Sequence, residues 1–200
     1  MHKNISYIIM IVIFAIFWIW ASIKPIHFDD WVLENILVFI TIPVLFFTRK
    51  KFEFSILSYS LITLFMILHI IGAHYTYAEV PWGLTLGEWL GTDRNMYDRL
   101  VHLLFGVLWV YPIFELFVRR VKVSGFWAYF VPFMIVSALS GIYEVIEWGA
   151  VAVVDPEAGI AFLGSQGDIW DAQKDMLLAK LGALWSLGVV WISSRLFAIS

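Results

Sequence analysis

The 200-residue sequence predicts an all-α membrane protein, a bundle of six transmembrane helices. Apolar residues make up 62% of the chain, which is more apolar surface than one soluble domain buries. Six apolar runs are each about 20 residues long, the length that crosses about 30 Å of hydrocarbon as a helix. The basic residues fall in alternate loops between these runs, as they do in multi-pass proteins.

The six predicted spans follow one another along the chain. The first ends in Trp18-Ile19-Trp20 without a small-residue cleavage site, which indicates an uncleaved span rather than a signal peptide. No second domain or repeat is evident, so we expect a single integral membrane domain over residues 1–200. The predicted boundaries are 5–23, 32–48, 54–73, 98–117, 125–150 and 172–194.

The charges in the loops predict the orientation. Lys and Arg are retained on the cytoplasmic side during insertion. The loops 24–31, 74–97 and 151–171 hold acids and Trp but few cations, and we place them outside. With an even number of spans, the N- and C-termini are then cytoplasmic. The basic residues on the cytoplasmic side are Lys3, Arg49, Lys50, Lys51, Arg119, Arg120, Lys122 and Arg195.

Ionisable residues gather at the outer ends of the last four spans. In LHIIGAHY, His69 and His74 lie about 140° apart around a helix, so both cannot face one site, and His74 is the better candidate. In MYDRLVHLLFG, Asp98 and His102 stack on one face at i, i+4, while Arg99 is expected to point elsewhere. Such a pair binds a metal jointly, or the carboxylate orients the imidazole. Alternatively, Asp98 caps the helix and His102 is a satisfied core histidine.

Two carboxylates near the outer end of the fifth span form the strongest local signal. GIYEVIEWG places Glu144 and Glu147 on one face at i, i+3. Glu144 lies about 9 Å inside the helix end. Desolvation and mutual repulsion are costly there unless a cation, a proton or a basic side chain compensates. The competing interpretation is a salt bridge to Arg94, Arg99 or Lys174.

The sixth span opens with three aspartates in SQGDIWDAQKDM. Asp168, Asp171 and Asp175 share one face if the helix begins near Asp168. Acids in a first helical turn complement the helix dipole, which accounts for Asp168, leaves Asp171 open and does not account for Asp175. Asp175 therefore needs a partner, and the best candidates are His102 and the two glutamates of the fifth span. Gln166, in the preceding turn, is a further candidate for the pocket.

The topology brings these groups to one membrane face, so we predict an outward-facing pocket of carboxylates and imidazoles. Such ligands suit a divalent ion such as Mg²⁺, Mn²⁺, Zn²⁺ or Fe²⁺. The absence of cysteine excludes thiolate ligands and thiol nucleophiles. The metal-ligand candidates are His74, His102, Glu144, Glu147, Asp171 and Asp175; the catalytic candidates are Glu144, Glu147 and Asp175; further pocket candidates are Asp98, Gln166 and Asp168.

Three classes of function are compatible with this pocket. The first is a metal-dependent hydrolase or transferase acting on a lipid-linked or amphiphilic substrate, with a remaining carboxylate as general base. The second is a carrier or binding protein for a cation or small solute, although the inner halves of the spans are almost purely apolar. The third is an accessory protein whose charge network fixes helix packing. The expected partners are the lipid bilayer and a lipid or small-molecule ligand, with no nucleic acid.

The stretches YDRLVHLLFG (97–106), YEVIEW (143–148) and LGSQGDIWDAQKDMLLAKLGA (163–183) resemble the bacterial YjdF-like inner-membrane proteins, a family catalogued as a domain of unknown function. The resemblance extends over most of the chain. It implies a multi-pass protein of the bacterial inner (cytoplasmic) membrane. It implies no activity, substrate or catalytic residue, so the chemistry has to be argued from the residues above.

Overall fold

The computed structural model describes residues 2–151, 163 and 165–197, and all regular structure in these residues is helical. Six of the helices are long and apolar enough to cross a membrane. The predicted fold class is therefore confirmed, and each predicted span differs from its helix by four residues or fewer at either end. The six are α1 (His2–Ala21), α2 (Phe28–Thr48), α3 (Ile56–Tyr75), α5 (Tyr97–Leu116), α6 (Phe126–Val151) and α8 (Asp171–Phe197).

Three short elements complete the described chain. A 3₁₀ turn, η1 (Tyr77–Glu79), and the helix α4 (Pro81–Trp89) lie between α3 and α5, and the π-helical turn η2 (Phe117–Val121) extends α5. Proline suits the first position of α4, because that residue needs no backbone donor there. Residues 74–97 were predicted to be a loop, because α4 is too short for the hydropathy pattern of a span.

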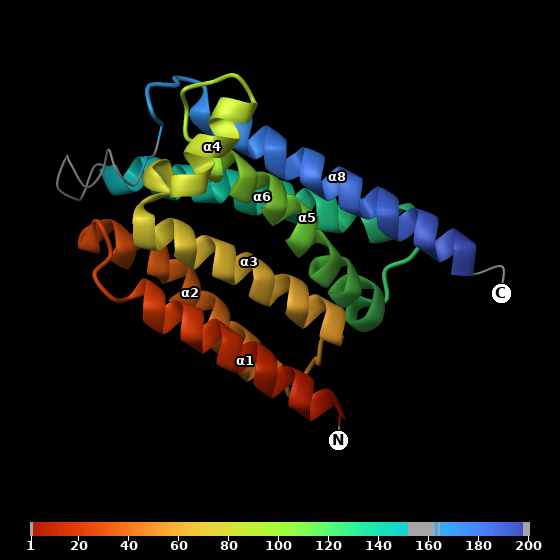
Figure 1. The fold of residues 1–200 in the computed structure, drawn as a ribbon. Coiled ribbons are helices and arrows are strands. Elements are labelled where there is room, and N and C mark those ends of the chain that lie inside the picture. The colour runs from red at the N-terminus through yellow and green to blue at the C-terminus, as the bar shows by residue number, and fades with distance from the viewer. Residues whose placement is uncertain (1, 152–162, 164, 198–200) are drawn as a thin grey trace.

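The spanning helices alternate in direction, so the two termini lie at the same end of the bundle (Figure 1). That end also holds the α2–α3 turn with Arg49, Lys50 and Lys51 and the α5–α6 connection with Arg119 and Arg120; we call it the basic end. The opposite end, where α5 and α8 begin and α4 lies, is called the polar end. Whether the basic end faces the cytoplasm stays a prediction.

Helices α5 and α8 pack most closely, because small residues line their contact. A Cβ atom at Gly106 would overlap the carbonyl oxygen of Ala179, and one at Gly182 would overlap that of Leu103. The buried face of α8 therefore places Asp171 and Asp175 against the start of α5. This face consists of Asp171, Asp175, Ala179, Ala183, Ser186 and Leu187.

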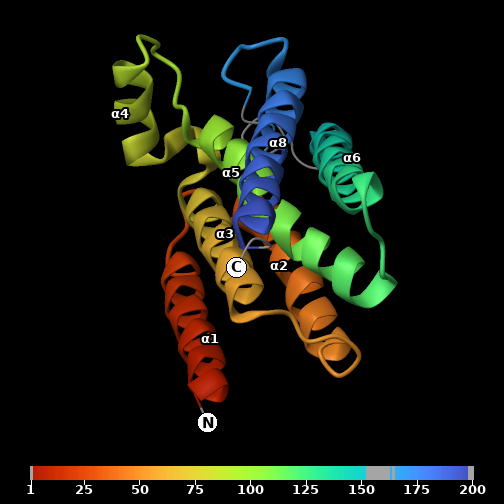
Figure 2. The same cartoon turned by 90° about the vertical axis from the view of Figure 1, so that its right-hand side faces the viewer.

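The other helices surround this pair. Helix α1 packs on α3 at the edge of the bundle, and α6 lies on the far side of α5 from α1 (Figure 2). Side chains such as Ile11, Phe46 and Val145 are more than half exposed on the outward faces. Apolar side chains on these faces contact lipid in a membrane-spanning bundle.

Candidate functional site

Ionisable residues of three helices meet at the polar end. All of them were candidates in the sequence, and each is 8% exposed or less. Helix α5 contributes its first turns, α6 its last turns and α8 its first turns, so the topology brings them to one depth. We call the set the acidic cluster; it consists of Asp98, His102, Glu144, Glu147, Asp171 and Asp175.

An imidazole links α5 to α6 within the acidic cluster. Nε2 of His102 lies 3.4 Å from Oδ1 of Asp98, one turn earlier on the same helix. The same nitrogen lies 3.6 Å from Oε1 of Glu144. The i, i+4 spacing of Asp98 and His102 thus places both groups on one face of α5, as their sequence spacing predicts.

Arg99 joins α5 to α8, and the expectation that it points elsewhere is wrong. Its Nη2 atom lies 2.7 Å from Oδ1 of Asp171 and 3.0 Å from Oδ2 of Asp168. Its Nη1 atom lies 2.7 Å from Oδ2 of Asp175. Arg99 precedes His102 by three residues, so the two are neighbours on the helix surface, and the long arginine side chain reaches across to α8.

The guanidinium of Arg94 also binds the Asp171 carboxylate. Nη2 of Arg94 lies 2.6 Å from Oδ1 of Asp171, and its Nη1 donates a 2.6 Å hydrogen bond to the carbonyl oxygen of Ser165. Within the described residues, the two glutamates of α6 form no salt bridge with Arg94, Arg99 or Lys174. The arginines bind the aspartates of α8 instead, so the salt-bridge interpretation of the glutamates does not hold.

Asp168 lies before the first turn of α8, which begins at Asp171 and not near Asp168. Its Oδ1 accepts a 3.0 Å hydrogen bond from the amide of Trp170, which fits the turn-capping role considered for it. Its Oδ2 lies 2.6 Å from Nζ of Lys174. The hydrogen bonds from Lys174 and Trp170 lower the pKa of Asp168, so this carboxylate is ionised at neutral pH.

Two further candidates lie outside the acidic cluster. Oε1 of Gln166 accepts a 2.9 Å hydrogen bond from the amide of Asn95, and its Nε2 donates a 3.1 Å bond to the Asn95 carbonyl. Gln166 therefore fastens the turn before α8 to the segment before α5. Nδ1 of His74 lies 3.1 Å from the carbonyl oxygen of Ala21, and its ring lies 4.5 Å from that of Trp20. His74 thus packs between α3 and α1, away from the acidic cluster.

A second polar network, which was not predicted from the sequence, joins residues of α2, α3, η1 and α6. Glu34, 2% exposed, accepts a 2.6 Å hydrogen bond from the hydroxyl of Tyr143. Its carbonyl oxygen lies 2.9 Å from Nε2 of His69, whose Nδ1 lies 2.6 Å from the hydroxyl of Tyr77. Burial raises the pKa of Tyr77 well above its usual value, so this hydroxyl stays protonated. We call Glu34, His69, Tyr77 and Tyr143 the Glu34 network.

Two buried oxygens of the acidic cluster have no hydrogen-bond partner among the described residues: Oδ1 of Asp175 and Oε1 of Glu144. Buried polar atoms are nearly always bonded, so these two need an explanation. Asp98, His102 and Asp175 each offer one ligand atom, and these atoms all lie within 4.8 Å of one another. Carboxylate oxygens with one imidazole nitrogen form a donor set that fits a divalent cation.

The charges of the acidic cluster do not balance within it. Five carboxylates face two guanidiniums, those of Arg94 and Arg99, because Lys174 binds Asp168 at the rim. Uncompensated charge is costly away from water. A cation, bound protons or an imidazolium at His102 must therefore supply the remaining positive charge.

The acidic cluster borders a cavity of about 550 Å³ between α2, α3, α5 and α6. Asp98, His102 and Glu147 line its polar end from α5 and α6. Most of the remaining wall is Ile, Leu, Val, Phe and Trp. Three members of the Glu34 network complete the polar end from the other side: His69, Tyr77 and Tyr143.

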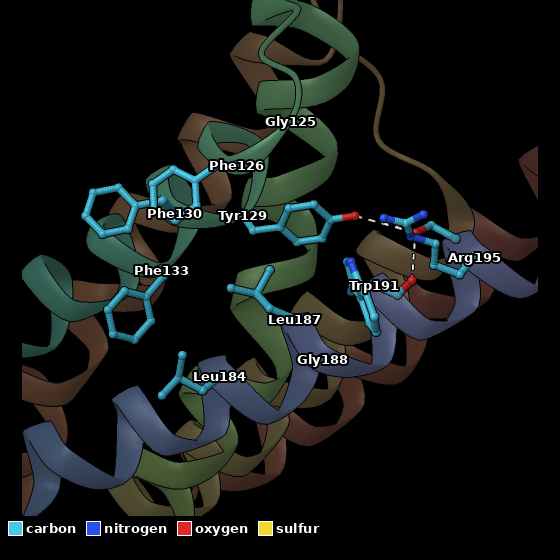
Figure 3. Close-up of a pocket in the computed structure, with 11 residues that line it drawn as sticks. Gly125, Phe126, Tyr129, Phe130, Phe133, Leu184, Leu187, Gly188, Trp191 and Arg195 are labelled. Atoms are coloured by element: carbon cyan, nitrogen blue, oxygen red, sulfur yellow. Dashed lines mark hydrogen bonds between the residues drawn. The ribbon is translucent and has the colours of Figure 1, made fainter.

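A larger cavity of about 830 Å³ lies at the basic end between α6 and α8 (Figure 3). Tyr129, Phe133 and Trp191 line it, with Arg195 beside the ring of Trp191. No carboxylate or imidazole of the described residues lines this space. It therefore offers no metal ligands and no general base.

The family described as "Predicted membrane protein (DUF2238)" matches residues 6–195, which include all the residues of both polar networks. The chain belongs to this family. It is 40% identical over 155 residues to "Inner membrane protein YjdF" of Escherichia coli (strain K12), covering 77% of this chain and 74% of that protein. No solved structure matches. The family and the six apolar helices confirm the predicted multi-pass inner-membrane protein.

In this DUF2238 member, polar chemistry and apolar space are therefore adjacent. The acidic cluster supplies carboxylates and an imidazole within the first and last turns of three spans, and the guanidiniums of Arg94 and Arg99 pair with its aspartates. The cavity beside it supplies a long apolar wall. An amphiphile is the kind of ligand that uses both.

Proposed function

We propose that this protein is a membrane-embedded, divalent-metal-dependent hydrolase or transferase acting on a lipid-linked or amphiphilic substrate. One observation carries the proposal. Asp98 and His102 belong to the candidate metal-ligand set, and the same two residues line the polar end of the apolar cavity. A headgroup at this end would contact the ligand residues while its hydrocarbon lies in the cavity.

The proposed roles follow from the contacts. Asp98, His102 and Asp175 would hold the ion, which supplies Lewis acidity toward a carbonyl or phosphoryl oxygen. Arg99 positions Asp175 through its 2.7 Å contact. Glu147 is the general-base candidate, because it is buried and lines the polar end of the cavity.

The distribution of polar groups supports an enzyme over a carrier. A transport path needs polar groups beyond the membrane midplane. The buried carboxylate near the basic end is Glu115, and its oxygens accept hydrogen bonds from Ser55 and Ser58 and pair with Arg119. This carboxylate joins the start of α3 to the end of α5 through hydrogen bonds. It lies near the opposite end of the bundle from the acidic cluster and contacts none of its residues.

The unpartnered oxygens of Asp175 and Glu144 argue against a purely structural network. A network selected only for helix packing gains nothing from buried acceptors that lack donors, since each such atom costs free energy. An ion held by Asp98, His102 and Asp175 would account for the Asp175 oxygen, and the Glu144 oxygen lies 3.6 Å from Nε2 of His102 in the same ligand set.

Elemental analysis of the purified protein tests the proposal. We expect about one divalent ion per chain, lost in Asp175→Asn and His102→Gln and retained in Asp29→Asn, whose side chain is exposed on α2. Size-exclusion chromatography would show that each variant is folded. Folded wild-type protein that binds no divalent ion at any physiological concentration contradicts the proposal.

Glu147→Gln separates catalysis from binding. This variant is expected to keep the ion and to lose turnover of ester or phosphoester amphiphiles, because an amide cannot accept the proton. Ion flux through proteoliposomes without turnover would instead establish a carrier.

A further inference from the structure

The cavity is long and narrow. Its wall follows α5 from Asp98 to Leu116, a rise of about 27 Å at about 1.5 Å per residue, against about 30 Å of membrane hydrocarbon. A volume of about 550 Å³ spread along this wall is enough for one extended hydrocarbon chain.

The cavity opens sideways toward lipid between α2 and α6. Ile40 on α2 and Ile142 on α6 both line it, yet they are 58% and 55% exposed. In a spanning bundle such exposed apolar side chains face the bilayer, so the cavity and the surrounding lipid share this boundary. Figure 2 shows α2 and α6 as separate helices on either side of α5.

One hydrogen bond joins the two helices beside this opening. The hydroxyl of Tyr143 on α6 donates to Glu34 on α2 at 2.6 Å. The ring of Tyr143 lies 6.4 Å from that of His102, so the bond lies next to the acidic cluster. The polar end of the cavity is thus closed by the Glu34 network, while its apolar length borders lipid.

We propose that the cavity binds a lipid with a single hydrocarbon chain, which enters from the bilayer between α2 and α6. The chain lies along α5, and the headgroup lies between the Glu34 network and His102. This inference rests on the proposed function for the role of the headgroup, and it narrows the substrate to single-chain amphiphiles. Because the volume of the cavity suits one chain, we expect two-chain phospholipids to bind less well.

Photolabelling in nanodiscs tests this inference. The probe is a lysophospholipid whose palmitoyl chain carries a diazirine, compared with a two-chain phospholipid that carries the same labelled chain. We expect the single-chain probe to label the α5 wall around Phe105 and Trp109, and unlabelled lysophospholipid to compete. The two-chain probe should label outward positions only, such as Ile11 on α1.

Two substitutions that fill the cavity provide the specificity control. Ser140→Phe on α6 and Thr41→Phe on α2 replace buried small side chains that line it, and each should reduce labelling of α5 about tenfold or more. Val145→Phe introduces the same residue on α6 at a 63% exposed position outside the cavity and should leave labelling unchanged. Thermal unfolding identifies any variant that fails to fold, and the other variant then decides.

The outcomes separate this inference from the proposed function. Labelling of α5 that both filling variants leave unchanged, or equal labelling by the two probes, overturns the single-chain site. Labelling that behaves as expected in a protein without bound metal supports the lipid site and overturns only the metal-dependent reaction. Metal binding without labelling of α5 supports the metal site and overturns only the lipid site.

Discussion

Arg99 binds three aspartates of one segment, and this arrangement decides how α8 begins. The guanidinium lies within 3.0 Å of carboxylate oxygens of Asp168, Asp171 and Asp175, and it also donates a 2.9 Å bond to the Asp171 carbonyl. A planar fork with five N–H donors is suited to several acceptors at once, and an ammonium is not. Arg99 is therefore the main positive charge of the acidic cluster.

Replacement of Arg99 should destabilise the fold more than loss of any exposed ion pair. Arg99→Ala leaves the buried Asp175 carboxylate without a guanidinium, a loss of about 3–5 kcal/mol in the free energy of unfolding, while Asp171 keeps Arg94 and Asp168 keeps Lys174. Arg99→Lys should recover part of the lost free energy of unfolding, because the ammonium keeps the positive charge. Lys174→Ala is the matched control, since Lys174 is 52% exposed and solvent screens its pair with Asp168. Thermal unfolding in detergent measures all three, and equal stability of Arg99→Ala and wild type would contradict this role.

Single residues also show where sequence reasoning fails. The spacing of Asp98 with His102 and of Glu144 with Glu147 predicted helix faces, because i, i+3 and i, i+4 neighbours share a face in any regular helix. The choice of His74 over His69 rested on depth alone. The sequence of an apolar span does not show which of its faces turns inward. In the structure, α3 turns His69 toward Glu34, within the Glu34 network.

At the scale of elements, the contact of α5 with α8 positions the acidic cluster. Gly106 and Gly182 let the two backbones approach, each against a carbonyl of the other helix. The same register places Asp171 and Asp175 opposite Arg99. A shift between these helices would change the distances among the candidate metal ligands.

Enlarging either glycine should therefore loosen both the fold and the acidic cluster. Gly106→Ala forces a Cβ into the Ala179 carbonyl, and overpacking of this kind costs about 1–3 kcal/mol. Gly188→Ala, on the same helix pair but facing open space, should be neutral or slightly stabilising, because alanine favours helix. The midpoint of thermal unfolding distinguishes the two variants, and an unaltered midpoint in Gly106→Ala would show that the helices are not so closely packed.

The spans were predictable because about 20 apolar residues in a row have few other stable environments than the bilayer. Helix α4 was not predictable in this way. It has nine residues, and its apolar residues are interrupted at three places, by Gly83, by Thr85 and by Gly87-Glu88, so it does not match the pattern of a span. Nor was Glu34 singled out, because it lies two residues after the predicted start of the second span at residue 32, whereas α2 begins at Phe28 and carries Glu34 almost two turns inside. The packing partner of each helix depends on contacts far apart in the sequence, and hydropathy does not encode them.

At the scale of the whole molecule, charge is divided between the two ends of the bundle. Arg49, Lys50 and Lys51 lie at the basic end, and the acidic cluster lies at the polar end. Basic loops stay in the cytoplasm during insertion, so the cavity is expected to present its polar end to the outside.

Labelling of single cysteines tests this orientation. The chain has no cysteine of its own, so Ser165→Cys and Lys51→Cys can be compared in an otherwise unreactive protein. In intact cells an impermeant maleimide should label position 165 and not position 51, because only the polar end is outside. Labelling of position 51 alone would invert the topology and place the polar end of the cavity toward the cytoplasm.

In the proposed function, the acidic cluster holds a divalent ion through His102. Electron spin-echo spectroscopy of the protein loaded with Mn²⁺ tests it most directly, because the echo is modulated by a directly bound imidazole nitrogen. We predict about one tightly bound Mn²⁺ per chain with modulation from a single imidazole, absent in His102→Gln and unchanged in His74→Gln. Tightly bound Mn²⁺ without nitrogen modulation, or no tight binding at all, would contradict the account.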